Sequence, residues 1–341
     1  MTAVPTLIRP MPVRALIHTL LPYSWRFRLL LESRIPKQLS QDASSGGYDL
    51  IIVNDIDLLP WAVRSGPSLL SKNPGARIHL DVHEFHLWAA DENLPRLQER
   101  SLRGYHGWLR GHIASPVFAT RSTVADGIAD LYAAEFQIER PLIVRNSPAY
   151  VELSPTPVDP DRIRLIYHGN AEMTRGLGLL VEAFRMVDER FTLTFMLTGH
   201  DEGKRTLREL THGLADRIEF RDAVPMREVA TALNAFDLEV IFYPPTSPNF
   251  LYSFPNKFFE SVQGRIGVVV GESPSMTAVV NEFGNGAIVP GWTAADLAAG
   301  LNALTAEQID GFKRGSDRCA HVLNSGTEKA HFLESIAGVN A

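Results

Sequence analysis

The sequence contains very little cysteine. Cys319 is the one cysteine in 341 residues, which excludes an internal disulfide and a zinc site built from thiolates alone. Long apolar runs are also missing, since none approaches the roughly 20 residues that cross a bilayer. The N-terminus has no basic stretch followed by an apolar core, so no secretory signal is expected. These absences predict a reduced, cytoplasmic protein.

An excess of positive charge is absent as well. The chain carries 39 acidic and 33 basic residues, a formal net charge of -6, so no overall positive field attracts nucleic-acid phosphates. Hydrophobic residues make up 45% and charged residues 21% of the sequence, which is typical of a globular protein. A chain of 341 residues is long for one core and sufficient for two domains.

Short apolar runs alternate with amphipathic stretches along most of the chain. Because the apolar runs are continuous, they predict parallel strands that are buried on both faces. Between them, residues such as Leu177, Leu180 and Phe184 recur at helical spacing. This order predicts βαβ units and an α/β fold with doubly wound parallel sheets. The predicted strands are Asp49–Asn54, Arg77–Val82, Val117–Thr120, Leu142–Arg145, Ile163–His168, Thr192–Thr198, Arg217–Arg221, Leu238–Tyr243 and Gly267–Val270.

A proline-rich segment interrupts the pattern near the middle of the chain. Four prolines lie within Ser147–Asp161, which predicts a stiff linker between two similar α/β halves. We therefore expect an N-terminal Rossmann-like domain at 1–153 and a C-terminal Rossmann-like domain at 154–322, followed by a final helix at 323–341. In such sheets, ligands bind beyond the carboxyl ends of the strands.

The first candidate loop, 169–176, follows the strand Ile163–His168. Its bounding glycines, Gly169 and Gly176, would let backbone N–H groups approach an anion at the start of the next helix. Arg175 adds a fixed charge that suits a phosphate. The alternative is an ordinary helix start with an exposed arginine.

The second candidate loop, 244–260, follows the strand Leu238–Tyr243. Asn256 and Lys257 stand at the start of a predicted helix, where free N–H groups and an ammonium could hold a diphosphate. Glu260, about one turn on, could accept hydrogen bonds from ribose hydroxyls. The alternative is a capped helix with a surface Lys–Glu pair of little energetic weight.

A third candidate is the polar end of the strand Arg77–Val82. Asp81, His83 and Glu84 are titratable and close together, which suggests a site. Neighbouring residues of a strand point to opposite faces and no second ligand cluster is evident, so a metal site is disfavoured. We interpret His86, His106 and His112 as ordinary histidines.

Taken in order, these motifs resemble retaining glycosyltransferases of family 4, which have the GT-B fold. The resemblance covers roughly residues 48–290. It implies two facing Rossmann-like, doubly wound parallel-sheet domains with the donor cleft between them. Residues 1–153 would form the acceptor-side domain and 154–322 the nucleotide-sugar domain, and the final helix at 323–341 would pack back on the first domain. The matching segments are Asp81-x-His83-Glu84, Arg145-Asn146-Ser147-Pro148, Tyr167-His168-Gly169 through Arg175-Gly176 with Glu182-Ala183-Phe184, Leu197-Thr198-Gly199, Ile218-Glu219-Phe220 with Val224-Pro225, Asp237-Leu238, and Phe254-Pro255-Asn256-Lys257-Phe258-Phe259-Glu260.

The resemblance also implies roles for particular residues. Arg175 and Lys257 would neutralise the donor diphosphate, Glu260 would bind ribose, and His83 would lie beside the donor sugar. His83, Arg175 and Lys257 are therefore the expected catalytic residues, and neither a metal nor a cofactor is expected. The expected donor-binding residues are Gly169, Asn170, Gly199, Val224, Asn249, Ser253, Asn256 and Glu260.

We thus expect a retaining hexosyltransferase of polysaccharide biosynthesis that uses a uridine- or guanosine-linked sugar donor. The expected acceptor is a glycan, a lipid-linked glycan or a small molecule. Tyr252 replaces the first glutamate of the family's Glu-x7-Glu pair, which leaves open a non-catalytic GT-B binding or scaffold subunit. A GT-B nucleotide-sugar epimerase is less favoured, because no flanking acid–base pair of carboxylates is evident.

The segment Pro12–Leu39 mixes basic residues with leucine, isoleucine, tryptophan and phenylalanine. A basic amphipathic stretch can contact an anionic membrane surface, which would suit a lipid-linked acceptor at the inner membrane face. An ordinary domain helix with a solvated basic face is the favoured alternative. The basic residues are Arg14, Arg26, Arg28, Arg34 and Lys37.

Overall fold

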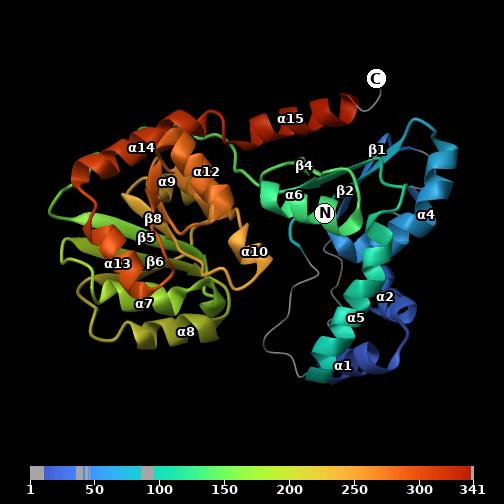
Figure 1. The fold of residues 1–341 in the computed structure, drawn as a ribbon, viewed down its shortest axis with the longest axis horizontal. Coiled ribbons are helices and arrows are strands. Elements are labelled where there is room, and N and C mark those ends of the chain that lie inside the picture. Colours follow the sequence, from blue (N-terminus) through green and yellow to red (C-terminus); the bar gives the residue numbers. More distant parts are fainter. Residues whose placement is uncertain (1–10, 36–40, 43–44, 46, 86–95, 339–341) are drawn as a thin grey trace. The chain divides into compact units, whose positions relative to one another are not determined.

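The computed structural model describes residues 11–35, 41–42, 45, 47–85 and 96–338. The chain divides into two compact units, Met1–Ile143 and Val144–Ala341, and each contains a sheet accompanied by helices (Figure 1). Within these residues, no helix combines the length and the apolar character needed to cross a bilayer.

The first unit contains a four-stranded parallel sheet with the order β1-β2-β3-β4. Its strands are β1 (Leu50–Asn54), β2 (Arg77–Asp81), β3 (Thr120–Thr123) and β4 (Leu142–Ile143). Its helices are α1 (Met11–Leu20), α2 (Tyr23–Leu30), η1 (Glu32–Arg34), η2 (Ile56–Leu58), α4 (Leu59–Lys72), α5 (Arg96–Ile113) and α6 (Asp126–Phe136).

The third strand lies three residues later than the sequence predicts. Val117 and Phe118 are buried, but Phe118 N–H bonds to the Ser115 carbonyl in a turn, and pairing with β2 begins only at Thr120. The apolar run therefore lies in a buried turn, while polar residues form the strand.

Helix α2 is attached to α5 by a buried arginine. Arg26 donates from Nε to the Leu21 carbonyl over 2.7 Å and from Nη1 to the Ser101 hydroxyl over 2.7 Å. Its guanidinium is therefore committed to the protein interior, and the expectation that Arg26 belongs to a basic outer face is wrong. Lys37 and the side chain of Arg14 lie outside the described part of the chain.

The second unit contains a six-stranded parallel sheet with the order β10-β9-β8-β5-β6-β7. After β5, the chain adds β6 and β7 on one side and then returns to place β8 on the other. The strand order therefore reverses between β5 and β8, the position where open α/β sheets bind ligands. The strands are β5 (Ile163–Asn170), β6 (Phe191–Thr198), β7 (Ile218–Asp222), β8 (Leu238–Ile241), β9 (Gly267–Val270) and β10 (Gly286–Ile288).

Helices cover both faces of this second sheet, so it is doubly wound (Figure 1). Helices α7, α8 and α13 pack together on one face, and α9, α11, α12 and α14 lie on the other. The helices are η4 (Met173–Arg175), α7 (Leu177–Phe184), α8 (Asp201–Leu210), η5 (Met226–Glu228), α9 (Val229–Leu233), α10 (Pro248–Leu251), α11 (Asn256–Gln263), α12 (Pro274–Phe283), α13 (Ala294–Asn302), α14 (Ala306–Ala320) and α15 (Ser325–Gly338).

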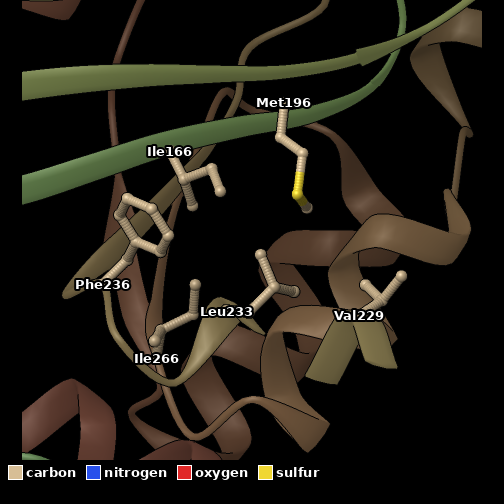
Figure 2. Close-up of a cluster of buried hydrophobic side chains, with 6 residues drawn as sticks. All are labelled: Ile166, Met196, Val229, Leu233, Phe236 and Ile266. Atoms are coloured by element: carbon tan, nitrogen blue, oxygen red, sulfur yellow. The ribbon is translucent and has the colours of Figure 1, made fainter. Parts of the chain in front are cut away.

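A cluster of buried apolar side chains fixes the face of the sheet that α9 covers. Ile166 of β5 and Met196 of β6 point toward Leu233 of α9 (Figure 2). Such a cluster is stabilised mainly by removal of apolar surface from water. The remaining members are Val229, Phe236 and Ile266. Cys319 of α14 is also buried in this unit.

The proline-rich segment is irregular but is not a free linker. Val151 donates its N–H to Gln263 Oε1 over 3.1 Å, and its carbonyl accepts from Arg265 Nη2 over 2.8 Å. Farther along, Val158 N–H donates to Asp310 Oδ1 over 3.2 Å. These bonds attach the segment to the second unit, which begins at Val144.

The last helix, α15, is attached to the start of the same unit. Glu328 accepts from the backbone N–H of Arg145 over 2.9 Å, and Ser325 N–H donates to the Pro148 carbonyl over 2.8 Å. The expected packing of residues 323–341 on the first domain stays a prediction.

Candidate active site

A buried histidine links two carboxylates where β5 meets β8. His168, near the end of β5, lies with Nδ1 2.8 Å from Glu239 Oε2 and with Nε2 2.8 Å from Glu260 Oε2. Its backbone N–H also donates to Glu239 Oε1 over 3.2 Å. Because both ring nitrogens face carboxylate oxygens, the geometry requires an imidazolium that donates from both. Burial disfavours the charge, but Glu239 and Glu260 outweigh it and raise the pKa of His168 to about 9.

A lysine ammonium is buried beside this cluster. The Lys257 side chain is 5% exposed, and Nζ lies 3.3 Å from the centroid of the Tyr167 ring. Glu239 Oε1 is 3.9 Å away, and Nζ makes no hydrogen bond within the described residues. Burial disfavours the charged form, yet Tyr243, Tyr167 and Glu239 together raise the pKa of Lys257. The ammonium is therefore charged at neutral pH, and its N–H donors are available to a ligand.

Helix α11 places the lysine and Glu260 on one face. Residues three apart in a helix are neighbours, so Lys257 and Glu260 both point toward β5 and β8. Pro255 precedes the helix, and Phe254 packs against Phe259 with ring centroids 4.5 Å apart, which fixes how the chain enters it. The alternative of a solvated surface Lys–Glu pair is wrong, because both side chains are buried, with Glu260 bonded to His168 and Lys257 Nζ lying over the Tyr167 ring.

The loop after β5 brings a second cation to the same tyrosines. Arg175 in η4 donates from Nε to Glu172 Oε2 over 3.0 Å. Burial lowers the pKa of Arg175, but Tyr243 and Glu172 more than compensate, so the net shift is upward. Tyr243 also contributes to the raised pKa of Lys257, whose Nζ lies 5.6 Å from the centroid of the Tyr243 ring. Gly176 lets this loop lie close to the end of β8. Its φ is 75°, and a Cβ there would lie 2.8 Å from the Phe242 carbonyl oxygen.

Two further glycines lie at the ends of β5 and β6. Gly169 has φ 117°, a conformation that residues other than glycine rarely adopt, and it lies directly beside the ammonium, since a Cβ there would be 3.7 Å from Lys257 Nζ. Gly199 has φ 91°, and a Cβ there would lie 1.9 Å from Asn170 Oδ1. Gly169, Asn170 and Gly199 are thus grouped at one edge of the sheet.

The other expected donor-binding residues are more dispersed. Val224 follows β7 and packs against the apolar cluster of Figure 2. Asn249 is half-buried in α10, while Asn256 is exposed at the first position of α11. Ser253 Oγ is buried without a hydrogen-bond partner among the described residues. Their roles stay predictions.

His83 belongs to a separate cluster in the first unit. Its Nε2 lies 2.9 Å from Asp81 Oδ2, and this bond to Asp81 raises the pKa of His83. Asp81 Oδ1 accepts from the Ser122 hydroxyl over 2.6 Å, and Ser122 Oγ lies 2.8 Å from His79 Nε2. Because burial lowers the pKa of His79 to about 4, this ring is neutral, with Nε2–H donating to Ser122 and Nδ1 accepting from Thr120. The chain of bonds fixes Asp81, and Asp81 orients the half-exposed His83 ring.

Of the neighbouring histidines, His112 contacts Trp108 and His106 contacts Tyr105, both on α5. His86 lies outside the described residues.

The sequence interpretation missed the central pair of the second unit. His168 lies in the matching segment Tyr167-His168-Gly169, but the resemblance assigns it no role. Glu239 is not a candidate residue on the sequence pattern. A signal was present: Glu239 is a charged residue inside the apolar strand Leu238–Ile241, where a buried charge needs a partner.

Comparison with solved structures identifies the architecture. The chain aligns with sucrose-phosphate synthase from Thermosynechococcus elongatus at TM-score 0.68 and 14% identity, covering 94% of this chain and 80% of that one. A glycosyltransferase from Rickettsia africae aligns at TM-score 0.65 and 11% identity, covering 99% and 84%. An alpha,alpha-trehalose-phosphate synthase (UDP-forming) from Burkholderia vietnamiensis aligns at 0.60 and 12%, covering 96% and 87%. The predicted fold class, two parallel-sheet α/β domains of GT-B glycosyltransferase type, is confirmed.

The second unit also matches a sequence family. Residues 162–307 match the family model described as "Glycosyl transferases group 1", and this range includes Lys257, His168, Glu239 and Glu260. Comparison with curated protein sequences found no match.

Proposed function

We propose that the protein is a retaining glycosyltransferase of family 4 type that transfers a hexose from a nucleoside diphosphate sugar. The observation that carries this proposal is the buried Lys257 ammonium at the carboxyl ends of β5 and β8, where Nζ has no well-formed hydrogen bond to a described residue. Leaving buried donors unpaired is costly, and a diphosphate would supply charged acceptors for them. The family match over the same residues supports this assignment.

Each expected residue then has a physical task. Lys257 and Arg175 would neutralise the diphosphate as it leaves the sugar, which is a task of positioning and electrostatic stabilisation. Glu260 would accept hydrogen bonds from the ribose, and His83, oriented by Asp81, would act on the donor sugar. Two protein cations serve the diphosphate, so the proposed reaction requires no metal and no cofactor.

The proposed donor base is uracil or guanine. The Burkholderia vietnamiensis neighbour is a UDP-forming synthase, which makes UDP the first nucleotide to test. The proposed acceptor is a glycan, a lipid-linked glycan or a small molecule, and the proposed location is the cytoplasm.

Calorimetric titration with UDP, GDP, ADP, CMP and their sugars, with and without EDTA, tests this function. We expect saturable binding of one nucleoside diphosphate that EDTA does not change. In Lys257→Met the dissociation constant should rise about tenfold or more, the cost of one charge-assisted contact. Lys329→Met is the matched control, because Lys329 is exposed on α15. Failure of every nucleotide to bind would overturn the proposal in favour of a non-catalytic scaffold subunit.

We also propose peripheral contact with an anionic membrane surface. Leu16 and Leu20 are exposed on α1, and Trp25 is exposed on α2 near the exposed Arg28. Apolar side chains beside positive charge favour anionic lipid surfaces. Sedimentation with anionic vesicles should capture the protein, and Leu16→Glu should release it. Equal sedimentation with neutral and anionic vesicles would contradict this contact.

A further inference from the structure

We infer that His168 is a positioning residue through which the site selects ribose. The inference rests on the proposed donor site. His168 holds one oxygen of the Glu260 carboxylate, so that the other oxygen is presented to the vicinal hydroxyls of the sugar attached to the base.

The two oxygens of Glu260 have different surroundings. Oε2 is 2.8 Å from His168 Nε2, whereas Oε1 has no hydrogen-bond partner among the described residues. The side chain is 12% exposed, and Oε1 is not one of the buried unpaired atoms of the described residues, so this oxygen is open to solvent and to a ligand. A carboxylate held at one oxygen has lost most of its rotational freedom before a ligand arrives, which lowers the entropic cost of binding.

Glu239 fixes His168 in turn. It accepts from both the backbone N–H and Nδ1 of the histidine, so the ring plane is set by a fully buried side chain on the next strand. Glu239 on β8 therefore holds His168 on β5, and His168 in turn holds Glu260 on α11. Two histidine–carboxylate contacts at opposite ring nitrogens allow only one ring orientation.

Charge balance explains why the residue is a histidine. The groups around the ring are two carboxylates, Glu239 and Glu260, and one other buried cation, Lys257, with Tyr167 beside it. With an imidazolium the cluster has two negative and two positive charges. A neutral residue at this position would leave Lys257 as the one cation for both carboxylates, and would leave Glu260 free to turn toward it.

The test compares a nucleoside diphosphate with its 2′,3′-dideoxy counterpart. A hydrogen bond to a charged acceptor is worth roughly tenfold or more in affinity, so the native protein should prefer the ribose form by at least about tenfold. In His168→Leu the preference should fall to about twofold or less, while the nucleoside diphosphate still binds through Lys257. His168→Gln, which keeps a donor directed at Glu260, should restore much of the preference.

Controls separate positioning from a general loss of structure. His212→Gln makes the same change at an exposed position of the second unit and should retain the full preference. In Glu260→Ala, adding His168→Leu should remove no further preference, because the two residues act through one contact. A loss of affinity that is equal for both ligands would show a merely structural role and would overturn the inference.

The inference and the proposed function fail differently. A native protein that binds nucleoside diphosphates, depends on Lys257 and shows no preference for ribose would overturn the inference alone. So would a His168→Leu variant that keeps the native preference. Failure to bind any nucleoside diphosphate would overturn the proposed function together with the inference.

Discussion

Raising the pH should destabilise the second unit through His168. The folded structure raises the pKa of this histidine from its ordinary 6.5 to about 9, because Glu239 and Glu260 outweigh the burial of the ring. The folded state therefore holds the proton more tightly than the unfolded chain does. The resulting stabilisation is fully present below pH 6.5 and is lost as the pH rises through 9. The difference between the two pKa values corresponds to about 3 kcal/mol.

The loss of folding stability at high pH can be measured on the second unit alone. Urea denaturation followed by pulse hydrogen exchange and mass spectrometry reports peptides from β5 and β8 separately from the first unit. With a urea slope of about 2 kcal/mol/M, the midpoint should fall by about 1.5 M between about pH 6 and about pH 10. Lys257 should not contribute in this range, since the structure raises its pKa.

The matched variant is His168→Gln, which cannot titrate. Its midpoint should be lower than that of the native protein at pH 6 and should change little with pH. Equal pH dependence in the native protein and the variant would refute the reasoning, because other groups would then cause the loss. A native midpoint that stays constant up to pH 10 would refute it as well.

Three further predictions follow from separate contacts. Asp81→Asn removes the carboxylate that raises the pKa of His83, so a histidine NMR titration should show a lower pKa, and an unchanged one would contradict the dyad. Leu233→Ala should lower the free energy of unfolding by about 2–5 kcal/mol in urea, since Leu233 is fully buried in the cluster of Figure 2; a loss below about 1 kcal/mol would contradict that packing. Gly176→Ala should weaken nucleotide binding, because a Cβ would displace the loop that carries Arg175, whereas Gly213→Ala, with positive φ but open space, should not.

Much of the fold follows from the sequence because buried parallel strands have a plain signature. Continuous apolar runs such as Ile163–His168 and Gly267–Val270 correspond to β5 and β9 in the structure. The third strand begins at Thr120 and not at Val117 as predicted, because burial of Val117 and Phe118 does not require that they pair in a sheet. The strand β10 was missed, since three residues that begin with glycine give no strand pattern.

The position of a candidate residue is easier to predict than its bonds. Lys257 is expected at the start of a helix after a strand, which is a local property of the chain, and the structure has it in the first turn of α11, while its role stays a prediction. The bonds of His168 join residues 71 and 92 positions apart, and they depend on the register of β5 against β8 and on the face that α11 presents. No local pattern carries that information. The hydrogen bonds that attach Val151 to the second unit are equally distant in sequence.

The single buried thiol makes the chain a convenient starting point for spectroscopy. Cys319 is fully buried in α14, and burial raises the pKa of its thiol to about 12, so the nucleophilic thiolate is scarce at neutral pH. Maleimide and methanethiosulfonate reagents should therefore leave the native protein unlabelled. One cysteine introduced on the exposed surface of each unit would then take a spin label or a fluorophore selectively. Distances between the two labels, measured with and without a nucleotide, would follow movement of one unit against the other.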